Sequence, residues 1–288
     1  MQAIPEELLV EVRGRYGAVA DSAEAIGGGT ASKLWRLHSD PPVVVRLSQY
    51  YPLEAQRWSC RVATTFAGQI PEAIAPLNAF DGEAVFLWQG QPITVWPLVA
   101  GAPLDRQDPA ERRQAARLLA RLHKAARSFP TLGDGQPPKP GDADAQQLLL
   151  DRELDEWLLS WQGGEHVGWI HRDFFPGNLL CRDGQIVGLV DWDEVEWSPL
   201  INELATAVWE FGKSPASDAL ILAHAREFLA EYERAGGPVR ASNDLIPLIR
   251  ERLRRDIAFW RRVQAADPAE DRAKVEVFRT LRDVRLLP

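Results

Sequence analysis

HRDFFPGNLL, at residues 171–180, carries the most specific pattern in this sequence of 288 residues. One of only five histidines stands directly before an Arg-Asp pair, and Pro-Gly-Asn follows before an apolar run. A simple turn at 176–178, with Asp173 as an ordinary loop residue, would account for these letters. In the alternative interpretation, Asp173 interacts with a hydroxyl group and Asn178 binds a metal ion. The surrounding sequence has to decide between the two.

A predicted strand follows this segment and ends on a second acidic residue. The apolar run 186–190 leads into Asp191, eighteen residues after Asp173. Phosphoryl transfer needs a carboxylate that orients the attacking hydroxyl, together with oxygen ligands for magnesium. One Asp and one Asn are enough for magnesium when nucleotide phosphates complete its shell. The loop also fits His-Arg-Asp-x-x-x-x-Asn letter for letter, which favours the second interpretation.

Together, HRDFFPGNLL and LVDWDE (189–194) resemble the aminoglycoside phosphotransferase and choline kinase superfamily, the small-molecule relatives of the protein kinases. The resemblance implies a bilobal, protein-kinase-like α+β fold. It has a small antiparallel-sheet N-lobe, a larger, mainly helical C-lobe, and the active site in the cleft. It also implies that Asp173 is the catalytic base, that His171 supports the loop, and that Asn178 and Asp191 bind Mg²⁺.

A glycine-rich loop extends the resemblance toward the nucleotide. Residues 27–32 read G-x-G-x-x-S where the family's nucleotide loop joins its first two strands, with serine in place of a third glycine. An ordinary glycine turn would explain the same letters. The resemblance implies nucleotide contacts from four residues of this loop: Gly28, Gly29, Thr30 and Ser32.

Two further segments extend the nucleotide site. Arg46 in VVVRLS occupies the strand position of the kinase lysine that pairs with phosphates, although arginine is not a neutral replacement for lysine. Glu54, on the following helix, is its candidate partner. A solvated strand residue and a surface acid are the alternatives. ITVWPLVAGAPL (93–104) resembles the family's hinge, which would hold adenine through backbone groups near Leu98 and Val99.

Several departures from protein kinases bear on the substrate. Arg172 stands where many small-molecule members have glycine, so contact with substrate or phosphate and a solvated loop arginine are both open. The predicted strand 186–190 leads into Asp-Trp-Asp at 191–193, and no Ala-Pro-Glu segment follows. We therefore expect a kinase that uses ATP or GTP with Mg²⁺ to phosphorylate a small hydroxyl compound. The alternative is a catalytically inactive relative that binds a nucleotide or metabolite for regulation.

The nature of the acceptor stays open in the sequence. Four acidic residues that follow Asp191 could form a pocket for a polycation: Asp193, Glu194, Glu196 and Glu203. Against this, the arginine-dense helix predicted at 248–263 would favour an anionic or neutral acceptor if it bordered the cleft. A solvated charged face is the alternative for that helix.

Composition limits the class of protein. The chain is 45% apolar and 26% charged, as in ordinary globular proteins, and a net charge of −8 argues against nucleic-acid binding. Two cysteines and the lack of a leader or an apolar span favour a cytoplasmic protein with no membrane partner. We expect an N-lobe at 1–98, with the nucleotide-binding sheet and helix, and a C-lobe at 99–288. The oligomeric state is not predicted.

Overall fold

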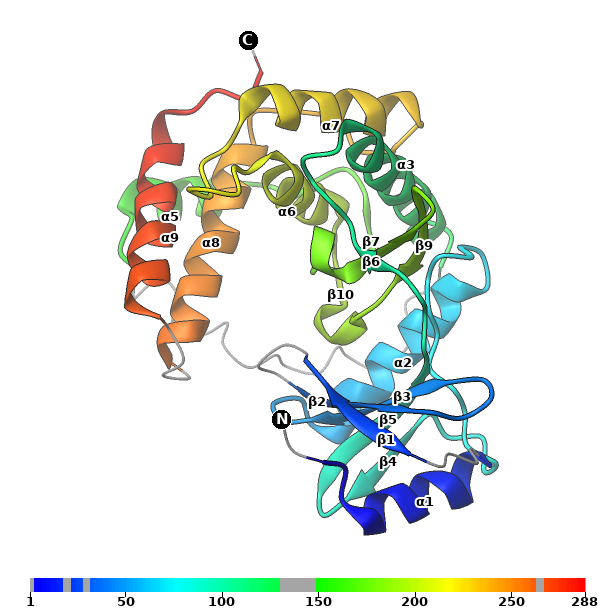
Figure 1. The fold of residues 1–288 in the computed structure, drawn as a ribbon. Coiled ribbons are helices and arrows are strands. Elements are labelled where there is room, and N and C mark those ends of the chain that lie inside the picture. The colour runs from blue at the N-terminus through cyan, green and yellow to red at the C-terminus, as the bar shows by residue number, and fades with distance from the viewer. Residues whose placement is uncertain (1–2, 18–21, 28–31, 130–148, 263–266, 288) are drawn as a thin grey trace.

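The computed structural model describes residues 3–17, 22–27, 32–129, 149–262 and 267–287. An antiparallel sheet with two helices forms the N-terminal region, and helices dominate the rest (Figure 1). This arrangement confirms the α+β fold class expected from the sequence.

The N-terminal sheet has five antiparallel strands in the order β1-β2-β3-β5-β4. They are β1 (Ala23–Ile26), β2 (Ser32–Leu37), β3 (Val43–Ser48), β4 (Val85–Trp88) and β5 (Gln91–Pro97). Helix α1 (Glu6–Tyr16), whose bounds are those expected, buries Leu8 and Val12 in a cluster with Val45 and Leu47. Because side chains alternate along a strand, Arg46 points to the opposite face of β3 from Val45 and Leu47.

The hairpin between β4 and β5 turns one residue earlier than the sequence suggested. We expected Gly90-Gln91-Pro92 to form the turn, but Gln91 pairs with Trp88 and Pro92 pairs with Leu87. The turn residues are therefore Gln89 and Gly90, with φ of 49° and 78°. Two consecutive positive φ values are typical of the tight turns that match the twist of a hairpin.

Helix α2 (Leu53–Ala67) ties the sheet to the helical region. Its Trp58 ring lies 5.0 Å from the Trp169 ring, and its Phe66 ring stacks at 5.3 Å on Trp192. All four residues belong to the large core cluster that continues through the C-terminal helices. The lobe boundary at residue 98 stays a prediction, but the hydrophobic core crosses it.

The helical region contains α3 (Pro109–Ala126), α5 (Arg152–Ser160), α6 (Leu200–Gly212), α7 (Leu222–Arg234), α8 (Leu245–Arg262) and α9 (Pro268–Thr280). Its short strands are β6 (Ala102–Pro103), β7 (Val167–Ile170), β8 (Leu179–Arg182), β9 (Gln185–Leu189) and β10 (Glu196–Pro199). The sequence Asp-Pro-Ala-Glu, at 108–111 and again at 267–270, predicts two helix starts, and Asp108 and Asp267 do cap α3 and α9 by accepting backbone N–H bonds. Within the described residues, no helix is both long and apolar enough to cross a bilayer.

Candidate active site

The segment 171–178 forms a loop between β7 and β8, and Asp191 follows β9 beside it. A short 3₁₀ turn at Pro176–Asn178 returns the chain toward the start of the loop. The Val190 N–H donates to the Asn178 carbonyl oxygen over 3.0 Å. This bond joins the end of the loop to the residue before Asp191, so the three polar residues expected at the site come from adjoining backbone.

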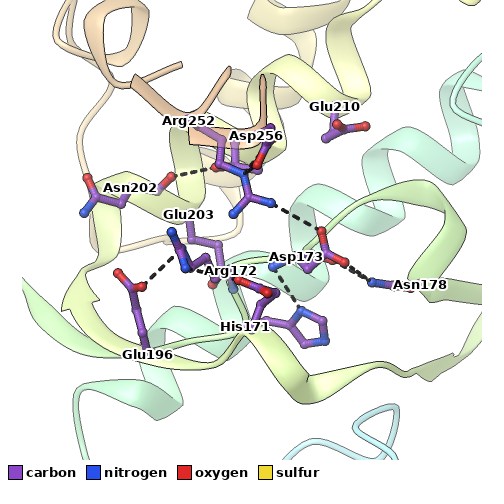
Figure 2. Close-up of polar contacts among 12 residues, drawn as sticks. His171, Arg172, Asp173, Asn178, Glu196, Asn202, Glu203, Glu210, Arg252 and Asp256 are labelled. Atoms are coloured by element: carbon purple, nitrogen blue, oxygen red, sulfur yellow. Dashed lines mark hydrogen bonds and ion pairs between the residues drawn. The ribbon is translucent and has the colours of Figure 1, made fainter. Parts of the chain in front are cut away.

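Asp173 and Asn178 are directly bonded, as Figure 2 shows. The Asn178 Nδ2 donates to Asp173 Oδ2 and also to the Asp173 carbonyl oxygen, both over 2.9 Å. With its nitrogen committed to Asp173, the Asn178 amide keeps its oxygen as the atom that can bind a metal ion. The 3₁₀ turn is thus the local device that brings the amide to the carboxylate.

His171 links the loop to the segment that follows β9. Its ring is 2% exposed and lies 4.6 Å from the Trp192 ring. Nε2 is 3.0 Å from the Val190 carbonyl oxygen, and the Asp173 N–H approaches Nδ1 at 3.3 Å. Both contacts are satisfied when Nε2 carries the proton. These contacts join the start of the loop to Val190 and to the Asp173 backbone, and the supporting role of His171 stays a prediction.

Asp173 lies in surroundings that oppose its ionisation. Its side chain is 30% exposed, and burial raises the pKa of Asp173 from 3.8 to about 7. Arg252 opposes this shift, whereas the nearby charges of Asp191 and Glu194 add to it. A carboxylate with a pKa near neutrality is suited to accept a proton in a reaction at neutral pH.

Asp191 is the more accessible of the two acids. Its side chain is 44% exposed, and its backbone is left-handed with φ of 65°. Together with the Asn178 oxygen it offers hard oxygen donors, the kind that Mg²⁺ takes in small number alongside nucleotide phosphates. These two residues therefore fit a magnesium ion bound with a nucleotide.

Arg46 reaches the same place from the sheet. Its Nη2 lies 3.0 Å from Asp191 Oδ1 and also bonds the carboxylate of Asp193. Its Nε donates to Ser32 Oγ over 2.9 Å, and only 7% of the residue is exposed. Burial lowers the pKa of Arg46, but the charges of Asp191 and Asp193 outweigh it and hold that pKa above its usual value. Arg46 is therefore a buried cation, not a solvated strand residue.

The predicted pair between Arg46 and Glu54 is wrong. Glu54 pairs instead with Arg57 over 2.9 Å, and its side chain is 71% exposed. The residue of α2 that enters the site is Gln56, which is 1% exposed and donates to Asp193 Oδ1 over 2.9 Å. Two residues along a helix turn the side chain by about 200°, so Glu54 and Gln56 face opposite ways. Asp193, the second Asp of Asp-Trp-Asp, was the signal in the sequence for the acid that pairs with Arg46 in place of Glu54.

Arg172 is held by carboxylates of the chain itself. Its Nη1 lies 3.1 Å from Glu194 and its Nε lies 3.1 Å from Glu196. Its backbone has φ of 66°, and its N–H donates to Glu203 over 2.7 Å. A bulky residue with positive φ is uncommon, and here these bonds fix it. The solvated-loop alternative is wrong, and contact with substrate or phosphate stays a prediction.

The acidic pocket considered for a polycation is not supported. Asp193 is bonded to Arg46 and Gln56, and Glu194 is bonded to Tyr51 and Arg172. Glu196 pairs with Arg172. Glu203 contacts His123 and the Arg172 N–H. Each of the four acids thus has a partner within the chain, which neutralises much of the charge that a polycation would need.

The remaining nucleotide residues are placed only in part. Gly28, Gly29 and Thr30 lie outside the described residues. Leu98 and Val99 are half-buried after β5, and the Leu98 N–H donates to the Pro42 carbonyl oxygen over 3.0 Å. That N–H is therefore engaged within the protein, so adenine contact through this segment stays a prediction.

Arg252 of α8 was not singled out from the sequence, yet it lies beside the expected base. Its Nη2 is 3.7 Å from Asp173 Oδ1, and its Nε is 3.0 Å from Asp256 Oδ1 (Figure 2). Other arginines of the same helix pair elsewhere, Arg254 with Asp155 and Arg261 with Asp271. The helix is thus neither a uniformly solvated face nor a basic wall of the site. The helical period did not show which arginine would meet Asp173.

The sequence is similar to known phosphotransferases. A sequence model of the phosphotransferase enzyme family (APH) matches residues 22–238. The chain is 28% identical over 243 residues to homoserine kinase of Phenylobacterium zucineum (strain HLK1), with 73% of each sequence covered. It is 27% identical over 195 residues to homoserine kinase of Caulobacter sp. (strain K31), which covers 60% of this chain and 59% of that protein.

Solved structures share the fold at low sequence identity. Amicoumacin kinase hAmiN, in complex with AMP-PNP, Ca²⁺ and Ami, has a TM-score of 0.77 at 12% identity and covers 99% of this chain and 96% of its own. Spectinomycin phosphotransferase APH(9)-Ia, in complex with ADP and spectinomycin, has a TM-score of 0.66 at 17% identity, covering 98% and 95%. The chain therefore has the fold of these proteins.

Proposed function

Because the chain belongs to the phosphotransferase enzyme family, we propose that it is a magnesium-dependent small-molecule kinase with an alcohol group as acceptor. It transfers the γ-phosphate of ATP or GTP to a hydroxyl, with Asp173 as the base. The observation that carries this proposal is the direct bond between Asp173 and Asn178 on a loop joined to Asp191.

The chemical step follows from this geometry. The acceptor oxygen attacks the γ-phosphorus while its proton passes to Asp173, and the bond between the γ-phosphorus and the bridging oxygen of the diphosphate breaks. Asn178 and His171 hold Asp173 in position through the bonds described above. Mg²⁺ bound at Asn178 and Asp191 would neutralise charge that builds up on the phosphate oxygens.

Arg46 is proposed to meet the nucleotide phosphates from the sheet side. It already lies 3.0 Å from Asp191, so a nucleotide whose metal ion is held by Asp191 would bring its phosphates next to this guanidinium. An arginine remains charged and offers several donors to phosphate oxygens.

The proposed acceptor is a small hydroxyl amino acid, with homoserine as the first compound to test. Two observations support this choice. The relatives named above are homoserine kinases, and the cation Arg252 lies beside Asp173, which suits a carboxylate better than a polyamine. The partnered acids around Arg172 also disfavour a polycationic antibiotic as the acceptor.

A catalytically inactive relative is the second candidate, and one observation favours it. Arg46 is already paired with Asp191 and Asp193, so its charge is shared before any nucleotide binds. An inactive protein would bind a nucleotide without releasing a diphosphate. Turnover therefore separates the two candidates.

The test is the release of ADP and GDP from ATP and GTP with Mg²⁺ across homoserine, choline, ethanolamine, aminoglycosides and simple sugars. Asp173→Asn should lower kcat by about 10²–10⁴-fold with a nearly unchanged nucleotide KM, because it removes a general base. Asp191→Asn should instead raise the KM for the magnesium nucleotide. A near-normal kcat in Asp173→Asn would show that another group accepts the proton.

A further inference from the structure

Arg252 stands out among the arginines of α8 because its guanidinium faces the expected base. Its Nη2 lies 3.7 Å from Asp173 Oδ1, which is longer than a hydrogen bond, and its Nε is held by Asp256. The side chain is 18% exposed. It is therefore a mostly buried cation that is positioned by Asp256 and makes no direct hydrogen bond to Asp173 through Nη2.

Two neighbouring arginines have clear structural tasks, and this contrast separates Arg252 from them. Arg250 bonds Asp151 and donates to the Phe278 carbonyl oxygen, which joins α8 to the start of α5 and the end of α9. Arg254 is fully buried and lies 2.6 Å from Asp155 of α5. Arg252 contacts neither helix in this way, and its contacts run toward the catalytic loop.

The charge of Arg252 is secure. Burial lowers its pKa, but the charges of Asp256, Asp173 and Glu194 outweigh burial and keep that pKa above its usual value. A guanidinium carries five donors in a planar fork, which matches the two oxygens of a carboxylate. A buried, charged fork beside the base is suited to recognise an anionic group on the molecule whose hydroxyl that base activates.

A cavity of about 400 Å³ adjoins this position, within the size range of small-molecule sites. Asp256, which holds Arg252, is part of its wall, and further lining residues include Glu210 of α6, Lys213 directly after α6, and Glu270 and Lys274 of α9. Lys213 pairs with Glu210 over 3.1 Å, and Lys274 pairs with Glu270 over 2.7 Å. These charges are paired within the chain, so the four side chains add little net charge to the cavity wall.

From these contacts we infer that Arg252 binds the carboxylate of the acceptor and thereby selects hydroxy acids over neutral or cationic alcohols. The inference rests on the proposed function, because it assigns a specificity-determining residue to the same site. Asp256 acts through Arg252 as a positioning residue. Homoserine, with a hydroxyl and a carboxylate on one four-carbon chain, is a molecule of the required kind.

The test compares L-homoserine with 3-aminopropan-1-ol, which is the same molecule without its carboxylate. We expect Arg252→Met to lower kcat/KM for homoserine by about 100-fold, mainly through KM, because it removes a charge-assisted contact to a bound carboxylate. Both rates are measured well above the pKa of Asp173, where losing the Arg252 charge no longer changes the ionisation of that carboxylate. Under these conditions the rate with 3-aminopropan-1-ol should change less than about threefold. Arg252→Lys should restore part of the homoserine activity, since lysine keeps the charge but loses the fork.

A matched control comes from the same helix. Arg255 pairs with Glu251, and its side chain is 39% exposed. Arg255→Met should therefore leave the kcat/KM for homoserine and the rate with 3-aminopropan-1-ol unchanged. An equal loss with both acceptors in Arg252→Met would place Arg252 at the transferred phosphate or at Asp173, and would overturn the inference. No loss with homoserine would overturn it as well.

The proposed kinase function and the inference about Arg252 can fail independently of each other. If the wild type releases a diphosphate only with neutral or polycationic acceptors, the kinase stands and the inference about Arg252 is overturned. If no acceptor supports turnover, homoserine binding is measured by calorimetry in the presence of Mg²⁺ and AMP-PNP. Binding that Arg252→Met abolishes and Arg255→Met keeps supports the carboxylate site, whereas absent or unchanged binding overturns it.

Discussion

The Asp173 carboxyl has to ionise in surroundings that favour its neutral form. Its pKa of about 7 in the folded chain lies above the usual 3.8. Folding therefore favours the protonated form, and the stability gained from it is complete below about pH 4 and is lost as pH rises through 7. Above pH 7 the Asp173 carboxylate is ionised and can accept a proton, at a cost in the free energy of unfolding.

Asp173→Asn should consequently stabilise the protein at alkaline pH while it removes turnover. At pH 8 we expect a gain of about 1–2 kcal/mol, less than the full shift implies because the side chain is partly exposed and screened. Thermal melts of both proteins at pH 8 and at pH 5.5 measure it. The difference in Tm should shrink at pH 5.5, and a variant less stable than the wild type at pH 8 would contradict the assigned burial cost.

At the scale of elements, helix α2 shows how one secondary structure can place neighbouring residues in opposite roles. Its outer face carries Glu54 in contact with Arg57, and its inner face carries Gln56 in contact with Asp193. The sequence identified the helix correctly, but it assigned the wrong residue to the site. Helix α8 repeats this pattern, because its arginines face different neighbours.

A pair of variants in α2 tests this assignment. Gln56→Ala should lower the free energy of unfolding by about 1–3 kcal/mol, because it leaves a buried Asp193 oxygen without its donor. It should also raise the nucleotide KM severalfold, since Asp193 helps to fix Arg46. Urea unfolding and nucleotide kinetics measure the two effects.

Glu54→Ala is the matched control on the same helix. Its exposed side chain should contribute about 0.5 kcal/mol or less at physiological salt, with an unchanged nucleotide KM. If Glu54→Ala raised the nucleotide KM more than Gln56→Ala, the partner of Arg46 inferred from the sequence would have to be reinstated.

At the scale of the whole molecule, one hydrophobic cluster runs from the sheet into the last helices. It includes Trp96 of β5, Phe66 of α2, Trp192 beside Asp191, and Phe278 of α9. The bonds from Arg46 to Asp191 and Asp193 cross between the same regions. The residues that assemble the active site therefore depend on packing that spans the chain.

This packing predicts a single cooperative unfolding transition. Tryptophan fluorescence and far-UV circular dichroism should give coincident urea curves. Phe66→Ala should shift both curves together by about 3–5 kcal/mol, because Phe66 is 1% exposed. Leu159→Ala, at a side chain that is 86% exposed, is the control and should shift neither. Two separate transitions would show that the lobes unfold independently.

Residues close together in the chain account for the local features of this protein. The extent of α1, the Asp108 and Asp267 caps, and the loop that carries Asp173 and Asn178 all depend on residues close together in the chain. Short-range hydrogen bonds and hydrophobic periodicity depend on the identity of neighbouring residues. The local sequence pattern is therefore enough to predict these features. The family resemblance followed from the same local pattern.

Which distant side chains come into contact depends on how the helices and the sheet pack together. Arg46 could pair with any acid near the site. It pairs with Asp191 and Asp193 because the packing of the chain places these two carboxylates beside it, whereas Glu54 points outward. Arg252, seventy-nine residues beyond Asp173, reaches it through the docking of α8. A helical pattern tells which residues share a face but not which neighbour that face will contact, because long-range packing sets the partner.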